Sequence, residues 1–141
     1  MAKGLKSVIR LNEWKVDQKR RELGERLSQV AALEDGLEAL EAELIQEQST
    51  AQDSPHEAGL FYGTYANGVI NRRDQFKEKI IKMEEQVVAA RDALSDAYRE
   101  LKKFEIINKQ REIREAEELE KKQQQQLDEL GLQNHSRKQD I

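Results

Sequence analysis

Histidines, carboxylates and glycines are the residues of this chain that could carry catalysis, bind a metal or hold a phosphate. The two histidines, His56 and His135, stand far apart, and neither has a metal-ligand partner at useful spacing. The many Asp and Glu residues lie on polar stretches, where carboxylates form a solvated face rather than an acid–base pair in a pocket. Glycines 59, 63 and 68 follow no predicted strand and lack the Lys-Ser/Thr of a phosphate-binding loop. These patterns predict that the protein is not an enzyme and needs no metal or cofactor.

The composition is that of a long helical protein. Of the 141 residues, 37% are charged and only 5% are aromatic, and there is one proline. Such a profile is typical of long helices and coiled coils. The absence of cysteine excludes disulfides and thiolate sites, and no apolar run approaches the ~18–20 residues of a membrane span. With no secretory signal pattern at its start, we expect a soluble, intracellular protein.

Charge is distributed unevenly along the chain. The net charge is -4. Residues 1–26 carry eight basic and four acidic groups, residues 27–57 carry eight acidic and no basic ones, and residues 58–141 carry sixteen of each. A chain this balanced is not an obvious nucleic-acid binder.

One narrow apolar seam dominates the second half of the chain. A first row of apolar residues recurs at every seventh position, and a second row lies four residues further along the chain. Alternating spacings of four and three are typical of a coiled-coil helix that needs a partner helix. Arg73 interrupts the second row and Asn108 marks its end. The two rows are Val69, Phe76, Met83, Ala90, Ala97 and Phe104, and Ile80, Val87, Leu94 and Leu101.

A similar seam predicts an earlier helix over residues 3–48. One row is strict, and a second row slips between adjacent positions. Gly24 and Gly36 weaken this helix by ~1 kcal/mol each relative to Ala, so packing must offset them. The two rows are Ile9, Val16, Leu23, Val30, Leu37 and Leu44, and Leu5, Leu27, Leu33 and Leu40.

The two helices are predicted to form an antiparallel coiled-coil hairpin, an all-α fold in a single domain over 1–141. A turn is expected over residues 49–54, a second helix over 55–130 that starts at Ser54-Pro55, and a frayed tail over 131–141. The three glycines between 59 and 68 leave two alternatives, a loop or a helix whose small residues allow close packing. Facing residues should have numbers that sum to about 105. The start of the first helix should therefore lie near Leu101 of the second helix, and ~30 residues of the second helix should protrude beyond it.

Basic residues and one tryptophan mark the start of the chain. Lys3, Lys6 and Arg10 lie near the positive end of the helix dipole, which is mildly unfavourable. They are either solvated or face an acidic partner. Trp14 lies off the main apolar row, and either packs partly against the hairpin or anchors a partner.

The layout resembles the FliJ family of bacterial flagellar type III export proteins over almost the whole chain. Three segments carry the resemblance: 8–23, with Val8-Ile9-Arg10-Leu11; 62–80, with Tyr62, Tyr65 and Gln75-Phe76; and 101–130. The last ends in Leu127-Asp128-Glu129-Leu130, its most specific part.

The resemblance implies a cytoplasmic two-helix hairpin similar to the long-helix part of the gamma subunit of rotary ATPases. Such a protein would place its terminal end in the pore of the hexameric export ATPase, contact the cytoplasmic part of the export gate and exchange substrate-specific export chaperones. It would be monomeric alone and at most peripheral to the membrane. The implied ATPase-binding residues are Lys3, Lys6, Arg10, Trp14, Lys103, Arg111 and Arg114, and the implied gate-binding residues are Phe76, Ile80, Met83 and Val87.

Two alternatives remain open from the sequence. One is the equivalent stalk protein of a virulence type III secretion system, which helical pattern cannot separate from the flagellar protein. The other is a structural coiled coil that self-associates, although the broken seam beyond Phe104 argues against strong pairing.

Overall fold

All described residues of the chain are helical. The computed structural model describes residues 2–53 and 58–139, without the side chains of residues 2, 3 and 58–62. Helix α1 spans Ala2–Asp53 and helix α2 spans Ala58–Gln139. The described residues contain no strand, and the predicted all-α fold of two long helices is confirmed.

The chain divides into two units. The hairpin unit comprises Lys15–Ala97, with the larger part of α1 and the first half of α2. The terminal unit comprises Met1–Trp14 and Tyr98–Ile141, with the start of α1 and the rest of α2.

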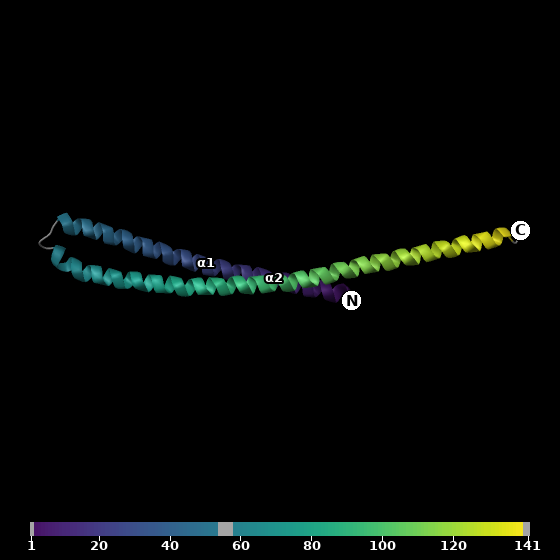
Figure 1. The fold of residues 1–141 in the computed structure, drawn as a ribbon, viewed down its shortest axis with the longest axis horizontal. Helices are drawn as coiled ribbons and strands as arrows, with labels where there is room; N and C mark the ends of the chain where they lie inside the picture. Colours follow the sequence, from purple (N-terminus) through teal and green to yellow (C-terminus); the bar gives the residue numbers. More distant parts are fainter. Residues whose placement is uncertain (1, 54–57, 140–141) are drawn as a thin grey trace. The chain divides into compact units, whose positions relative to one another are not determined.

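In the hairpin unit the two helices run side by side in opposite directions (Figure 1). On α2, buried or half-buried side chains recur at alternating spacings of four and three from Val69, which is only 1% exposed, to Ala97. On α1 the same alternation runs from Val16 to Leu44. The predicted seam on α2 is therefore the face that packs against α1.

A close contact between Gly36 and Phe76 fixes the register of the hairpin unit. The nearest approach of the Phe76 ring leaves no room for a Cβ atom on Gly36. The numbers of this pair sum to 112, whereas the sequence predicted facing residues that sum to about 105. The predicted register was wrong by roughly one heptad, because α1 continues beyond its predicted end.

The second apolar row predicted on α1 also needs correction. Leu27 is exposed. The seam position next to it is occupied by Arg26, which is half-buried. The row therefore reads Leu5, Asn12, Lys19, Arg26, Leu33 and Leu40, with a strict spacing of seven and three polar members.

Most polar residues in the seam are satisfied by their own helix. In the hairpin unit, the Lys19 ammonium lies 3.3 Å from Glu22, and Arg26 donates to Gln29 at 3.2 Å. In the terminal unit, Asn12 donates to the Val8 carbonyl at 2.8 Å, and Asn108 donates to Glu112 at 3.4 Å. Because these bonds stay within one helix, the polar residues need no polar partner on the other helix. An apolar residue can therefore face them across the seam.

The helix ends differ from the prediction. Residues 49–53, expected in the turn, continue α1, and Thr50 donates its hydroxyl proton to the Gln46 carbonyl at 3.1 Å. Residues 131–139, expected to fray, continue α2 through Gly131. The predicted helix start at Ser54-Pro55 lies outside the described residues.

Residues 58–68 are helical, which decides between the two alternatives for the glycine-rich segment in favour of the helix. Close packing of the two helices does not explain Gly63 and Gly68, because a Cβ atom on either would meet no atom within 4 Å. Close helix approach occurs at Gly36 instead.

Candidate functional site

The terminal unit contains an open groove at the start of α1. Leu5 and Lys6 of α1 line one part of it, and α2 supplies the rest. The groove has a volume of about 380 Å³. The α2 residues are Asn108, Arg111, Glu112, Arg114, Glu115 and Glu118.

This terminal groove brings together three of the residues predicted to bind the ATPase, Lys6, Arg111 and Arg114. Lys6 comes from the second turn of α1, whereas the two arginines lie about 100 residues later on α2. Their cationic groups share the groove with carboxylates, so it can bind a partner surface that carries both signs of charge.

Helical geometry explains why the groove is polar. Leu101 and Phe104 belong to the seam that packs against α1 in the terminal unit, and Asn108, Arg111 and Glu115 continue it with the same spacings. In the described part of the terminal unit, every side chain of α2 beyond Asn108 is exposed, the seam face included. An uncovered face is favourable in water only when it is polar.

The other predicted ATPase-binding residues lie outside the groove lining. Arg10 and Lys103 are exposed, and the Lys103 ammonium lies 5.7 Å from the centroid of the Phe104 ring. Trp14 is 58% exposed, so its ring is mostly in solvent rather than packed on the hairpin. The side chain of Lys3 lies outside the described part of the structure.

The four predicted gate-binding residues lie in the seam of the hairpin unit. Val87 is buried, and Phe76, Ile80 and Met83 are half-buried. Met83 lines a groove, together with Gln29, Ala32, Leu33, Lys79, Lys82 and Gln86. This second groove, the seam groove, has a volume of about 470 Å³ and a largely apolar floor.

Local charges on α2 hold Lys102 in its ionised form. Its ammonium lies 3.3 Å from the Glu105 carboxylate and 5.3 Å from the centroid of the Tyr98 ring. The hydrogen bond to Glu105, followed by the interaction with Tyr98, raises the pKa of Lys102 above its ordinary value. Lys102 is therefore a cation at neutral pH on the surface of the terminal unit.

Metal-binding and membrane-spanning features are not found in the part of the chain that the structure describes. No group of three or more His, Cys, Asp or Glu side chains is placed to hold a metal ion. His135 pairs with Gln139 at 3.1 Å on the same helix turn, and His56 lies outside the described residues. Neither described helix contains a stretch long and apolar enough to cross a membrane.

Sequence reasoning missed Leu5, Asn108, Glu112, Glu115 and Glu118 as groove residues. The register predicted from the sequence placed Leu5 near Glu100, eight residues away from Asn108. Finding them required the register, because Leu5 already belonged to the predicted α1 seam and only the register sets which α2 residues lie beside it.

Comparison with known proteins identifies the family. The family model for the flagellar FliJ protein matches residues 1–140. Flagellar FliJ proteins from two strains of Caulobacter vibrioides are 31% identical to this chain over 132 residues, which is 94% of each protein. No solved structure matches the chain. With a match over nearly its full length, the chain belongs to the FliJ family of flagellar proteins.

Proposed function

We propose that this protein is a coupling factor of flagellar protein export that acts by binding, without chemistry of its own. Its terminal unit enters the pore of the hexameric export ATPase and promotes assembly of the hexamer. Other surfaces contact the export gate and substrate-specific export chaperones. The protein is a cytoplasmic monomer when alone and works at the inner face of the export apparatus. Family membership supports a flagellar system rather than a virulence secretion system.

The observation that carries the ATPase proposal is the gathering of Lys6, Arg111 and Arg114 in the terminal groove. This groove lies where α1 begins and α2 continues without a neighbour in the terminal unit. Basic groups that come from two helices can hold both of them against carboxylates of one partner surface, which also carries cations opposite the groove's own carboxylates. The unfavourable position of Lys6 near the start of α1 thereby acquires a functional reason.

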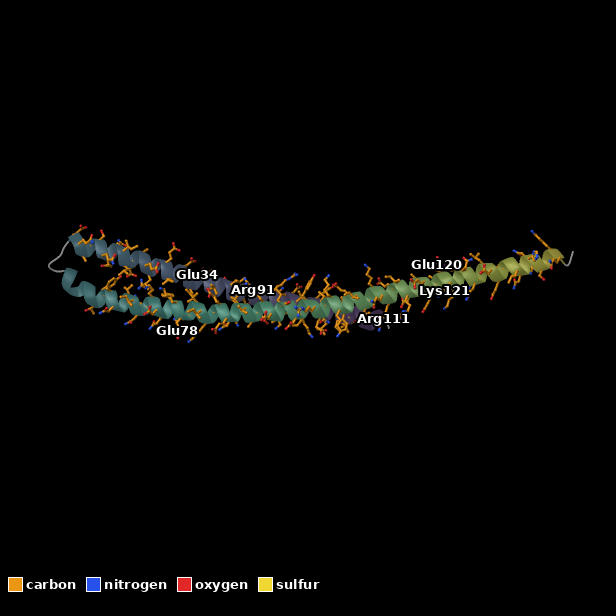
Figure 2. The ribbon with its side chains drawn as sticks, viewed as in Figure 1. Glu34, Glu78, Arg91, Arg111, Glu120 and Lys121 are labelled. Carbon is orange, nitrogen blue, oxygen red and sulfur yellow. The ribbon has the colours of Figure 1, made fainter. Side chains whose placement is uncertain are left out.

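The rest of α2 is exposed on every side, since all side chains from Lys109 to Gln139 are exposed. Figure 2 shows Glu120 and Lys121 on this segment, with no second helix beside them. Within it, Gln124 donates to Asp128 at 3.4 Å. Such pairs stabilise a single helix only by a few tenths of a kcal/mol each. Enclosure by a partner would give this segment the packing that most helices obtain from their own fold.

Charge reversal tests the ATPase contact. Lys6, Arg111 and Arg114 would be replaced together by Glu, and ATP turnover and hexamer formation by the export ATPase measured with each protein. The wild-type chain should stimulate both, and the triple variant should lose at least about 90% of the stimulation because three attractive contacts become repulsive. The matched control replaces Arg21, Lys77 and Arg91 by Glu, exposed residues outside the groove, and should retain stimulation. Equal loss in both variants, or no stimulation by the wild-type chain, contradicts the proposal.

The export gate contact is proposed at the seam groove of the hairpin unit, because this is where a predicted gate residue, Met83, is accessible. Ala32 lines the groove, whereas the neighbouring Ala31 is exposed outside it. Ala32→Glu should weaken binding of the cytoplasmic gate domain about tenfold by placing a charge on the apolar floor. Ala31→Glu is the control and should bind normally in the same titration. Unchanged binding by Ala32→Glu excludes this groove.

A further inference from the structure

One row of exposed residues on α2, spaced by seven, changes from charged to apolar at Ile106. Seven-residue steps along this row give Glu85 and Asp92 in the hairpin unit, then Arg99 at the start of the α2 segment in the terminal unit. From there the row becomes apolar, although each member remains exposed: Ile106 is 56%, Ile113 51% and Leu127 63% exposed, with Glu120 between the last two.

This outer apolar row does not belong to the seam. Ile106 follows the seam residue Phe104 by two positions, which corresponds to a rotation of about 200° around the helix. The seam itself becomes polar over the same stretch, through Asn108, Arg111 and Glu115. The apolar face of α2 in the terminal unit thus passes from the side that α1 covers to the opposite side.

A groove lies at the beginning of the outer row. It has a volume of about 510 Å³ and a largely apolar lining, because the hydrocarbon parts of Lys102 and Lys103 accompany the side chain of Ile106. The remaining lining residues are Tyr98, Arg99 and Ile107. We call this the outer groove.

The outer groove is rimmed by positive charge. Arg99, Lys102 and Lys103 all line it, and no carboxylate does. The carboxylate of the neighbouring Glu105 lies 3.3 Å from the Lys102 ammonium. Arg99 and Lys103 form no such ion pair with a carboxylate among the described residues. The surface therefore combines an apolar floor with a cationic edge.

We infer that the outer groove, together with Ile113, binds an amphipathic helix of a partner protein whose apolar stripe is flanked by acidic residues. Ile106 and Ile113 are seven residues apart, and this is the spacing at which a docked helix presents its own apolar side chains. Carboxylates beside that stripe complement Arg99 and Lys103, whereas a helix with basic flanks would be repelled. Because α1 covers the opposite face, docking leaves its packing intact.

A membrane surface fits this site less well than an acidic helix. The outer row offers two isoleucines before Glu120, and residues 115–129 carry six carboxylate groups, Glu120 included, and only two cations. Helices that lie in an anionic membrane surface instead carry Lys and Arg along the whole polar face. The inference does not depend on the proposed ATPase contact at the terminal groove, because the linings of the two grooves share no residue.

The test titrates the full-length chain against fluorescently labelled synthetic helices of about three heptads. One peptide carries Leu at its seam positions and Glu beside them, and its control has Lys in place of every flanking Glu. Fluorescence anisotropy should show at least about tenfold tighter binding of the acidic peptide, with a difference that shrinks as salt is added. No binding of the acidic peptide at about 100 μM, or equal binding of both peptides, overturns the inference.

Variants locate the binding site. Ile106→Ser and Lys103→Glu should each weaken the acidic peptide about tenfold. Ile81→Ser and Arg91→Glu are the matched controls: Ile81 is 59% exposed on the same helix, Arg91 is exposed, and neither substitution should change binding. Equal losses with Ile81→Ser and Ile106→Ser contradict the assigned site.

Vesicles containing phosphatidylserine form a separate arm, and Ile106-dependent binding to vesicles without binding to the acidic peptide would favour a membrane instead. Stimulation of the ATPase should remain unchanged in Ile106→Ser, so the two proposals fail independently.

Discussion

The ring of Phe76 packs directly onto the backbone of Gly36. An ideal Cβ atom on Gly36 would lie 2.8 Å from Cε1 of Phe76 and 3.0 Å from Cζ. The glycine thus provides the space into which an aromatic side chain of the α2 seam inserts. Its low helix propensity, a disadvantage when α1 is considered alone, is offset by this packing.

Replacing Gly36 by Ala should destabilise the protein. The substitution gains about 1 kcal/mol of helix propensity, but overpacking at a seam typically costs about 1–3 kcal/mol. We expect a net loss of about 1 kcal/mol in the free energy of unfolding, measured by urea titration with far-UV circular dichroism. A smaller ring partner, Phe76→Leu, should restore part of the loss in the Gly36→Ala background.

Gly24→Ala is the matched control for this prediction. A Cβ atom on Gly24 would meet no atom within 4 Å, so only the propensity gain of about 1 kcal/mol remains. Opposite signs for the two glycine substitutions are expected. The same sign for both would contradict the packing role of Gly36.

The register of the hairpin unit can be tested by a cross-link. With Gly36 next to Phe76, the half-buried Leu23 falls opposite Ala89 and Ala90, of which Ala90 is half-buried and faces the seam. The chain has no cysteine, so the double variant Leu23→Cys/Ala90→Cys contains one pair only. It should form an intramolecular disulfide in most molecules under mild oxidation, detected by a mobility shift on non-reducing gels. The control pair Leu23→Cys/Lys82→Cys, which follows the register predicted from the sequence, should remain reduced because its Cα atoms are too far apart.

Heptad spacing made the fold predictable, whereas the register was not. The α2 seam from Val69 to Phe104 is visible in the sequence because apolar side chains fill nearly every position. On α1 the positions of Asn12, Lys19 and Arg26 are polar, and the nearby Leu27 diverts the apparent row. Polar seam residues that bond within their own helix give no sequence signal of their buried position.

The candidate grooves were predictable only in part. Lys6, Arg111 and Arg114 were identified through the family resemblance, and the structure places them together. Their convergence depends on the register, which requires the length of the turn, and turn length carries no heptad signal. The sparse spacing of Ile106, Ile113 and Leu127, broken by Glu120, is visible in the sequence, but that spacing alone did not reveal an exposed row on the face opposite the seam.

Arg73 should be a destabilising residue of the seam. Its Nε atom is buried and finds no hydrogen-bond partner in the described part of the chain. Arg73→Leu removes this unsatisfied group and supplies an apolar side chain, so we expect the free energy of unfolding to rise by about 1–2 kcal/mol. Arg91→Leu, at an exposed position, should change it by less than about 0.5 kcal/mol in the same urea titration. A loss of stability in Arg73→Leu would show that the guanidinium has a partner in solution.

Tyr65 gives the hairpin unit a dependence on alkaline pH. Its hydroxyl group is buried without a hydrogen-bond partner among the described residues. Burial raises the pKa of Tyr65 above its ordinary value. The nearby Glu43 and Glu47 carboxylates raise this pKa further, whereas Arg72 lowers it. Because the folded-state pKa is raised, the associated stability is fully present below the ordinary tyrosine pKa of about 10. It is lost as the pH rises through the folded-state value.

Tyr65→Phe should therefore be more stable than the wild-type chain and lose less stability above pH ~10, since it has no buried hydroxyl to ionise. Thermal unfolding across a pH series measures both effects. The raised pKa of Lys102 produces a loss in the same direction, through its pairing with Glu105. Comparison with Lys102→Gln separates the two contributions, because that variant keeps the tyrosine. If Tyr65→Phe and the wild-type chain decline in parallel at alkaline pH, the hydroxyl is hydrated in solution and the helices are further apart beside Tyr65 than the structure places them.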